Sequence, residues 1–319
     1  KDMGHIPKIV CINGNGIGQY CDVARIPRKG ETAIPKNLRY AQDSGKGVNN
    51  AIVIGRLGGD VAYIGKAGKD EGGALNESWL KASGVNTEHF WLQEGIQTSL
   101  GLILLAESGE NMIINFDSPG SDLTMEEAIP HVEALQGAEY LITGFEIPID
   151  VALKSAETGQ RLGMKVFLNP SPIESAEELP EIPYVDTMCV NETEAALLSG
   201  AEETEDWLET AKLLCEKYKV KNTIITLGGD GACAWGERGS GKVLGIPVKL
   251  VDESGAGDAF LAVVVQNLVW GKKIQEALEY ANQYCAWLVQ KEGTEGGLGK
   301  YLWLDEMKEV LEWGGKGTL

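Results

Sequence analysis

Basic residues are scarce in this chain of 319 residues: 28 lysines and arginines stand against 47 aspartates and glutamates, for a formal net charge of −19. A surface this acidic repels the phosphates of a nucleic-acid backbone unless a local basic groove is present. Duplex nucleic acid is therefore not expected as the main partner. If a substrate carries phosphate groups, local dipoles or a metal ion must meet their charge.

Cysteine pairs and long apolar runs are also missing. The six cysteines form no C-x-x-C pair and do not cluster with the three histidines, so a zinc site of the usual spacing is not predicted. Cys11 and Cys189 lie inside short apolar runs and are interpreted as buried thiols of a reducing compartment. No apolar run approaches the ~20 residues that cross a bilayer. We therefore expect a cytoplasmic protein with no membrane insertion.

The motifs of three familiar enzyme classes are absent or incomplete. Gly14, Gly16 and Gly18 follow a predicted strand, but the third glycine comes one position too early for a dinucleotide-binding turn. Pro27 follows soon after and prevents a long helix there. A phosphate-binding loop before Ala67 has the wrong glycine spacing and lacks the final Ser or Thr, and no G-x-S-x-G elbow is present. These patterns disfavour an NAD(P) oxidoreductase, a P-loop NTPase and an α/β-hydrolase.

The chain does contain an alternation of short apolar β-rich runs and longer segments of helical period. Apolar strands separated by helices predict a mainly parallel sheet covered on both faces, which is a three-layer α/β/α fold. The predicted strands span 8–13, 140–143, 165–169, 187–191 and 222–227. The predicted helices span 49–57, 75–83, 125–135, 149–162 and 207–218, with three more at about 257–270, 274–290 and 304–313.

Two segments, at about 20–42 and 97–118, interrupt the alternation with strands. The second predicts a hairpin, TSLGLILLAE and NMIINF, around Gly109. Inserted strands of this kind predict a small lid on a single domain of residues 1–319. The alternative is an antiparallel edge of the main sheet. Lid strands with one apolar face commonly pair between subunits, so we expect a homodimer through the lid.

The stretch 251–260, VDESGAGDAF, is the most informative for chemistry, because a turn of small residues runs directly into an apolar helix. Free N–H groups at a helix start attract anions, and glycines let phosphate oxygens approach the backbone. Asp258 would repel a phosphate there, but it suits a base facing the hydroxyl that attacks the phosphate. The alternative is a first-turn carboxylate that stabilises the helix by ~0.3–1 kcal/mol.

Four elements of the sequence, in this order, resemble signatures of the ribokinase-like (PfkB) carbohydrate kinase family. SGKGVNNA at 44–51, followed by GRLGG at 55–59, resembles the N-terminal signature. NETE at 191–194 and TLGGDG at 226–231 resemble two internal elements, and GAGDAF at 255–260 resembles the C-terminal signature. The ordered set covers nearly the whole chain. It implies a ribokinase-like α/β fold that carries a small β-strand lid.

The resemblance implies transfer of the γ-phosphate of ATP to a hydroxyl of a small sugar or sugar-like alcohol, with Mg²⁺ as cofactor. Asp258 matches the catalytic base, and Glu194 matches the carboxylate that organises magnesium through water. The anion hole matches Gly255, Ala256 and Gly257. The sugar-side residues match Gly45, Lys46, Gly47, Asn49 and Glu146. The nucleotide-side residues match Asn191, Thr226, Gly228, Gly229, Gly231 and Asn282.

The chain departs from the family pattern after the first strand. The position of the family's sugar clamp falls on Gly18, which leaves Asn13, Asn15 and Asp22 as replacements, with Asn15 our candidate for substrate binding. Asp252 matches a residue that, in some relatives, binds a monovalent cation together with carbonyls near 291–297. The ion implied by that resemblance is potassium.

Two alternatives stay open: a nucleoside kinase of the same family, and a non-catalytic relative that only binds a sugar or nucleotide. Retention of Asp258 argues against the second. A sugar-phosphate kinase would need basic residues in the lid. Five lie there: Arg25, Arg28, Lys29, Lys36 and Arg39.

Overall fold

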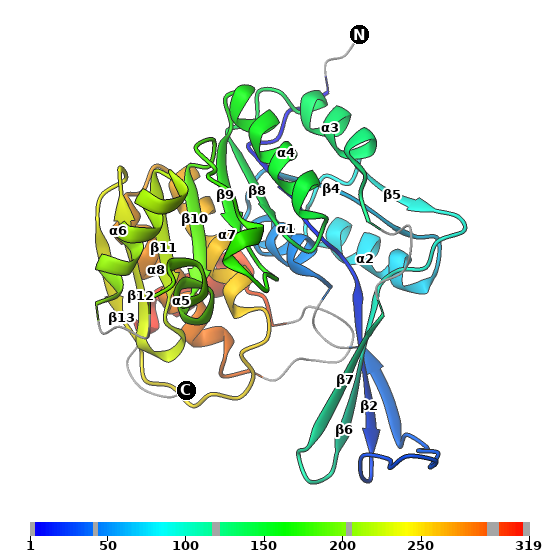
Figure 1. The fold of residues 1–319 in the computed structure, drawn as a ribbon. Helices are drawn as coiled ribbons and strands as arrows, with labels where there is room; N and C mark the ends of the chain where they lie inside the picture. The colour runs from blue at the N-terminus through cyan, green and yellow to red at the C-terminus, as the bar shows by residue number, and fades with distance from the viewer. Residues whose placement is uncertain (1–3, 41–43, 117–121, 202–205, 292–299, 315–319) are drawn as a thin grey trace.

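A large twisted sheet runs through the centre of the molecule, which is described here by a computed structural model over residues 4–40, 44–116, 122–201, 206–291 and 300–314 (Figure 1). Its strand order within these ranges is β13-β12-β11-β10-β9-β8-β1-β4-β5. All neighbours from β5 to β11 are parallel, and only β12 and β13 pair antiparallel. The strands are β1 (Ile9–Ile12), β4 (Val61–Gly68), β5 (Phe90–Gln93), β8 (Tyr140–Gly144), β9 (Lys165–Asn169), β10 (Thr187–Asn191), β11 (Asn222–Thr226), β12 (Gly231–Gly236) and β13 (Gly241–Leu244).

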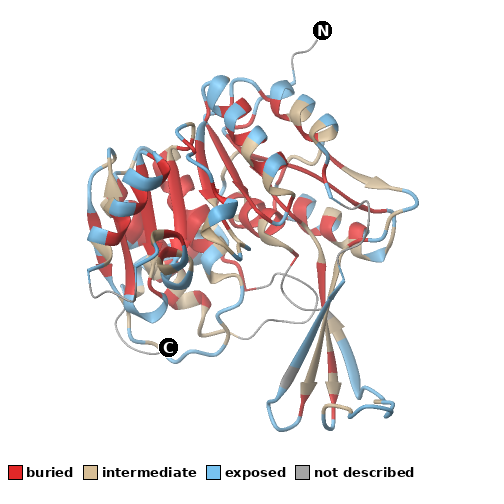
Figure 2. Ribbon diagram, in the orientation of Figure 1, coloured by how far each residue is buried: buried red, intermediate tan, exposed pale blue. Residues whose placement is uncertain are grey.

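Helices cover both faces of this sheet, as the unbroken apolar strands predict. One face carries α1 (Lys46–Arg56), α2 (Glu71–Ala82), α7 (Ala256–Val269), α8 (Ile274–Leu288) and α9 (Leu304–Trp313). The other carries α3 (Met125–Ala134), α4 (Ile149–Arg161), α5 (Glu192–Ser199) and α6 (Trp207–Tyr218). In β1, Ile9 and Cys11 enter the first core while Val10 and Ile12 enter the second, so every residue of the strand is buried (Figure 2).

The carboxyl ends of the parallel strands meet at one edge of the sheet. Ile12 at the end of β1 pairs with Ile64 of β4 and with Thr143 of β8. Farther along, Asn191 at the end of β10 pairs with Thr226 at the end of β11. Side chains that follow these strands therefore gather along one edge, where open α/β sheets place their ligands.

The predicted insertions form a separate sheet of four strands that projects from the body of the molecule (Figure 1). Its strands are β2 (Ile17–Val23), β3 (Asn37–Tyr40), β6 (Leu100–Ala106) and β7 (Asn111–Phe116), in the order β3-β2-β6-β7. The predicted hairpin is β6 and β7, and it does not extend the large sheet. β2 starts at Ile17, earlier than predicted, and pairs parallel with β6, so the small sheet is mixed.

Asp70 ties this small sheet to the large one. Its carboxylate caps α2 by accepting from the Gly73 N–H at 2.9 Å, and it also accepts from the N–H and hydroxyl of Thr98 at 2.8 and 2.6 Å. Burial raises the pKa of Asp70, but the hydrogen bonds from Thr98 and Gly73 outweigh burial and hold the pKa below its usual value. Because Thr98 stands just before β6, these hydrogen bonds fix the position at which the small sheet joins the rest of the molecule.

The helices of the described ranges include none that is both long and apolar enough to span a bilayer. All six cysteines are free thiols, and five of them are buried, as their apolar neighbours in the sequence predict.

Candidate active site

The start of α7 is shaped by a glycine and left open to solvent. Gly255 is the N-cap residue, with a φ of 74°, and a Cβ atom there would lie 2.1 Å from the Tyr301 hydroxyl. No side chain accepts a hydrogen bond from the first turn at this cap. A Cβ atom on Gly257 would meet no atom of the described structure within 4 Å. The first turn of α7 therefore presents N–H groups beside an empty cradle, which is the arrangement that binds anions.

Asp258 stands in this first turn and is held by α1. Its Oδ2 accepts from the Asn49 side-chain amide at 2.9 Å, and its Oδ1 lies 3.6 Å from the Lys46 ammonium. Asn50 donates to the backbone carbonyl of Asp258 at 2.8 Å. The carboxylate is 12% exposed. Both side-chain partners are donors, so they stabilise negative charge on a carboxylate that still reaches solvent.

Asn49, which the resemblance assigns to the sugar side, joins α1 to Asp258. Its side chain is fully buried. Its Oδ1 accepts from the Ser44 hydroxyl at 3.2 Å, while its amide nitrogen donates to Asp258. These contacts orient the Asp258 carboxylate, and sugar binding by Asn49 stays a prediction.

Close approach of α1 to β1 explains the glycine at the start of this helix. The Gly47 N–H donates to the Gly14 carbonyl at 3.0 Å, and a Cβ on Gly47 would lie 2.6 Å from the Asn13 carbonyl oxygen. Any side chain there would separate the helix from the strand. Gly45, the N-cap of α1, lines the cavity described below.

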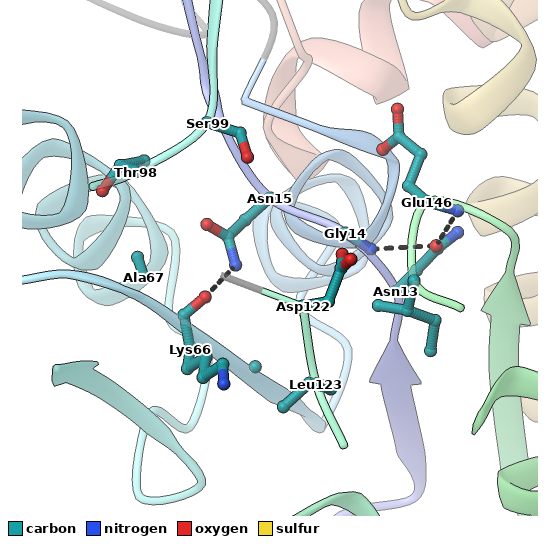
Figure 3. A pocket seen from close by; sticks show the side chains of 12 residues that line it. Asn13, Gly14, Asn15, Lys66, Ala67, Thr98, Ser99, Asp122, Leu123 and Glu146 are labelled. Atoms are coloured by element: carbon teal, nitrogen blue, oxygen red, sulfur yellow. Dashed lines mark hydrogen bonds between the residues drawn. The ribbon is translucent and has the colours of Figure 1, made fainter. Parts of the chain in front are cut away.

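Glu146 joins three segments of the site. Its backbone N–H donates to the Asn13 Oδ1 at 3.0 Å, and its own Oε1 accepts from the Lys46 N–H at 2.6 Å. The same Asn13 oxygen accepts from the Gly14 N–H at 2.9 Å (Figure 3). The side-chain oxygen of the buried Asn13 thus accepts the hydrogen bonds that connect the end of β1 to the loop after β8.

Asn15, the candidate for the missing sugar clamp, lies at the edge of the large sheet close to Asn13. Its amide nitrogen donates to the Lys66 carbonyl at 2.8 Å and to the Tyr63 hydroxyl at 3.1 Å, and its oxygen points away from Lys66 (Figure 3). Gly18 lies on β2 of the small sheet, and Asp22 pairs there with Arg39. Asn13 and Asn15 both line the small cavity at this edge, and of the three candidate replacements only Asn15 also lines the large cavity described next.

A cavity of about 1180 Å³ lies between the small sheet and the carboxyl edge of the large sheet. It is larger than the ~300–1,000 Å³ of a typical single-ligand pocket, so it has room for more than one reactant. The large-sheet side contributes Asn15 and Glu146, and the small sheet contributes Tyr20 and Arg39. Ser254, in the turn before α7, also lines the cavity.

The nucleotide-side residues of the sequence analysis lie at the ends of β10, β11 and β13. Asn191 caps α5, because its side chain accepts from the Glu194 N–H at 2.8 Å and its own N–H donates to Glu194 Oε1 at 3.1 Å. The Thr226 hydroxyl donates to the Val190 carbonyl at 3.4 Å, and Asn282 donates from α8 to the Leu244 carbonyl at 2.9 Å. Gly228, Gly229 and Gly231 belong to or adjoin the 3₁₀ turn that follows β11.

Glu194 on α5 and Asn169 at the end of β9 carry oxygens suited to a hard cation, while no group of three or more His, Cys, Asp or Glu side chains that could hold a metal is found in the described part of the chain. Burial raises the pKa of Glu194, and the opposing influences include the Asn191 N–H, the Lys46 charge and the Ser171 hydroxyl. The Oδ1 of Asn169, at the end of β9, is buried without a hydrogen-bond partner among the described residues. Mg²⁺ prefers such oxygens and keeps several waters, so a half-buried carboxylate and an unsatisfied amide oxygen fit it.

Two lysines near the site were missed as functional residues. Lys66 is 5% exposed, pairs with Glu127 at 2.8 Å, and lines a small cavity beside Asn15 (Figure 3). Its signal in the sequence is a lone charge inside the apolar run VAYIGKAG. Lys300 is 1% exposed and lies beneath the turn that precedes α7, with no comparable signal in its neighbours.

Comparison with known proteins establishes the family of the chain. The model of the pfkB family carbohydrate kinases matches residues 19–299. The chain belongs to this family. It is therefore a carbohydrate kinase, and the family activity is ATP-dependent phosphorylation of a sugar, as the four ordered motifs predict.

Individual relatives agree with this assignment. The ribokinase of Staphylococcus aureus is 26% identical over 307 residues, which cover 95% of this chain and 99% of that protein. The bifunctional ribokinase/ribose-5-phosphate isomerase A of Fructilactobacillus sanfranciscensis is 28% identical over 91% of this chain, and the match spans 54% of that longer protein. The structure of Arabidopsis thaliana ribokinase complexed with ribose and ATP aligns with a TM-score of 0.84 at 23% identity, covering 97% of this chain and 99% of that one, which shows the predicted fold.

The two glycines at the start of α7 are expected to respond differently to alanine. Gly255→Ala should lower the free energy of unfolding by at least ~1–3 kcal/mol, because its left-handed backbone and the Tyr301 hydroxyl both oppose a Cβ. Gly257→Ala should leave it unchanged or raise it by up to ~1 kcal/mol. Urea denaturation of both variants measures the difference, and equal losses would contradict this account of the turn.

Proposed function

We propose that the chain transfers the γ-phosphate of ATP to a hydroxyl of a small unphosphorylated sugar, with Asp258 as general base. The observation that carries this proposal is the position of Asp258. It stands in the first turn of α7 beside the open cradle at Gly257, and it is held there by Asn49 and Lys46. A base within reach of both the acceptor hydroxyl and an anion-binding helix start is what phosphoryl transfer to an alcohol needs.

In the proposed reaction, Asp258 takes the proton of the sugar hydroxyl as the oxygen of that hydroxyl bonds to the γ-phosphorus. The bond from the γ-phosphorus to the bridging oxygen breaks, and ADP leaves with the electron pair. The N–H groups of Gly255 and Gly257 stabilise negative charge on the oxygens in transfer, whereas the Ala256 N–H donates to the Glu253 carbonyl at 3.1 Å. Lys46, 3.6 Å from Asp258, stabilises charge on the base before it is protonated.

We assign the sugar to the cavity end lined by Asn15, Gly45 and Glu146. Their amide and carboxylate groups suit hydroxyls, which both donate and accept hydrogen bonds. The basic residues of the small sheet favour an unphosphorylated sugar, because several are already paired: Arg25 with Glu31, Lys36 with Glu107, and Arg39 with Asp22. Ribose is the first sugar to test, since it is the substrate named for the relatives.

We assign Mg²⁺ to Glu194, acting through water, together with Asn169. When bound, Mg²⁺ neutralises phosphate charge in a chain whose net charge is −19. The nucleotide is assigned to the ends of β10, β11 and β13, where Asn191, Thr226 and Asn282 lie. The 3₁₀ turn at Gly228–Asp230 stands at the same edge.

We further propose that the small sheet excludes water from the site. Tyr20 and Arg39 line the cavity wall opposite Glu146. A site open to solvent would let water compete with the sugar for the phosphoryl group, so a cover over the acceptor is required for specific transfer.

The outer face of the small sheet is proposed to pair with a second copy of the chain. Met112, Ile114 and Phe116 alternate along β7 and are 45%, 52% and 44% exposed, and Leu38 on β3 is 56% exposed. Leu38 pairs with Cys21, and the register continues through Leu104 to Met112, so these side chains share one face. An apolar face of this kind is covered in most proteins.

Asp258→Asn tests the base. Turnover with ATP and the best acceptor from a panel of sugars, sugar phosphates and nucleosides should fall at least ~10²-fold, while ATP affinity and fold persist. ADP release measures turnover. Glu209→Gln is the matched control, because Glu209 is also a first-turn acid and is exposed on α6. Near-wild-type turnover of Asp258→Asn would refute the base, and no ADP release with any acceptor would favour the non-catalytic alternative.

Glu194→Gln tests the magnesium site. The Mg²⁺ concentration for half-maximal rate should rise ~10–100-fold, as for other residues that act on a metal through an outer shell. Because burial raises the pKa of Glu194, protons should compete with Mg²⁺ at a higher pH than for an ordinary glutamate. In the wild type the Mg²⁺ requirement should therefore increase as the pH falls, and this dependence should weaken in Glu194→Gln. Glu192→Gln on the same helix is the control, and an unchanged requirement in Glu194→Gln contradicts the assignment.

Ile114→Lys tests the dimer. The wild type should sediment as a dimer at micromolar concentration, and Ile114→Lys should sediment as a monomer because it places a charge on the apolar face. Ile113→Lys is the control, since Ile113 is on the same strand but lines the cavity on the opposite face. A wild-type protein that sediments as a monomer would contradict the proposed dimer.

A further inference from the structure

Lys300 is the most deeply buried charge near the site. It is 1% exposed, and its ammonium donates to the Ser254 carbonyl and lies 3.5 Å from the Asp252 Oδ2. Its neighbour Cys285 has a thiol whose pKa burial raises to about 12, so that group is neutral at ordinary pH. A buried ammonium is retained only where oxygens compensate its desolvation, and here the Ser254 carbonyl and the Asp252 carboxylate belong to the turn before α7.

This turn sets the position of the anion-binding N–H groups. The Asp252 Oδ1 accepts from the Ser254 N–H at 2.9 Å, so the aspartate and the carbonyl held by Lys300 belong to one hydrogen-bonded loop. The next residue of the chain, Tyr301, donates its hydroxyl to the Gly255 carbonyl at 3.5 Å. Lys300 and Tyr301 together contact Asp252, Ser254 and Gly255 of this turn.

The oxygens around the Lys300 ammonium are also the ligands expected of a monovalent-cation site. A carboxylate and a carbonyl in a tight turn are hard donors, and Asp252 was predicted from the resemblance to bind potassium. The carbonyls at 292–297 of that prediction lie outside the described residues. The surroundings of Asp252 do not fit a bound potassium ion, because the lysine ammonium contacts both Asp252 and Ser254. A bound potassium ion and the Lys300 ammonium would each place one positive charge beside the Asp252 carboxylate and the Ser254 carbonyl.

We propose that Lys300 is a built-in cation that positions the anion hole, and that it makes turnover independent of added potassium. The proposal rests on the proposed kinase function, since it concerns the N–H groups of that site. Lys300 touches no reacting atom, so it is a positioning residue. Its charge pulls the carbonyl of Ser254 and the carboxylate of Asp252 toward the protein interior, which leaves the N–H groups that follow directed at the phosphate.

The first experiment uses the wild-type protein. Turnover is measured in potassium chloride, sodium chloride and tetramethylammonium chloride at equal ionic strength, and melting temperature is measured in the same three salts. We expect the same kcat and the same melting temperature in all three. A wild type that is active only with potassium would overturn the proposal and leave the kinase function intact.

The second experiment removes the charge. Lys300→Met should lower kcat by up to ~10²-fold, the cost of displacing a site by about 1 Å, with a smaller effect on the KM for the sugar. Potassium, but not tetramethylammonium, should restore part of the turnover and raise the melting temperature of this variant alone. Lys308→Met, on an exposed face of α9, should behave as the wild type. Wild-type turnover of Lys300→Met without potassium would overturn the proposal.

The remaining outcomes are also decisive. If Lys300→Met does not fold, Lys300→Arg replaces it as the test variant. Lys300→Arg keeps the charge, so it should fold and remain independent of potassium. A potassium requirement in Lys300→Arg or in the wild type contradicts the inference. If no acceptor is phosphorylated in any salt, the kinase function fails. The potassium-dependent rise in melting temperature of Lys300→Met then still tests whether the two cations use the same oxygens.

Discussion

The 2.9 Å hydrogen bond from Asn49 to Asp258 joins residues 209 positions apart, and the rest of the site depends on it. It connects the start of α1 to the start of α7, on the same face of the large sheet. A carboxylate at a helix N-terminus is ordinary, and by itself it only stabilises the helix. Asn49 fixes the direction of this carboxylate, as the proposed role of a base requires, because its side chain is buried and its Oδ1 accepts from Ser44.

The positive groups around Asp258 matter because the chain as a whole is strongly acidic. A chain with a net charge of −19 must accept an anionic nucleotide, so every positive element of the site has to be local. Lys46 stands 3.6 Å from the base, and Lys300 lies beneath the turn that carries the amides. The helix start adds a partial positive charge without a side chain. Each of these acts over a few ångströms, where the low dielectric of a half-buried site makes it effective against the surrounding acids.

Sequence periodicity predicted the three-layer fold because the strands that it identified are buried on both faces. It did not single out β4, β5, β12, β13 or the short helix α5. A candidate for chemistry could be named where a residue type stands at a local spacing, as for Asp258 after a small-residue turn, and its role as a base stays a prediction. Contacts between distant segments gave no such local signal, as for the hydrogen bond from Asn49 to Asp258. The buried ion pairs of Lys66 and Lys300 join segments that no local pattern connects.

Asn191 and Glu194 show why a structural and a functional interpretation of one motif need not compete. As a capping pair they satisfy the first N–H groups of α5, which fixes the carboxylate of Glu194 through the Asn191 N–H at 3.1 Å. That bond uses one carboxylate oxygen. Burial destabilises the remaining charge and raises the pKa of Glu194, and a nearby cation relieves that cost. The cap is therefore compatible with the proposed magnesium role, since a fixed and poorly solvated oxygen loses little freedom or hydration on binding.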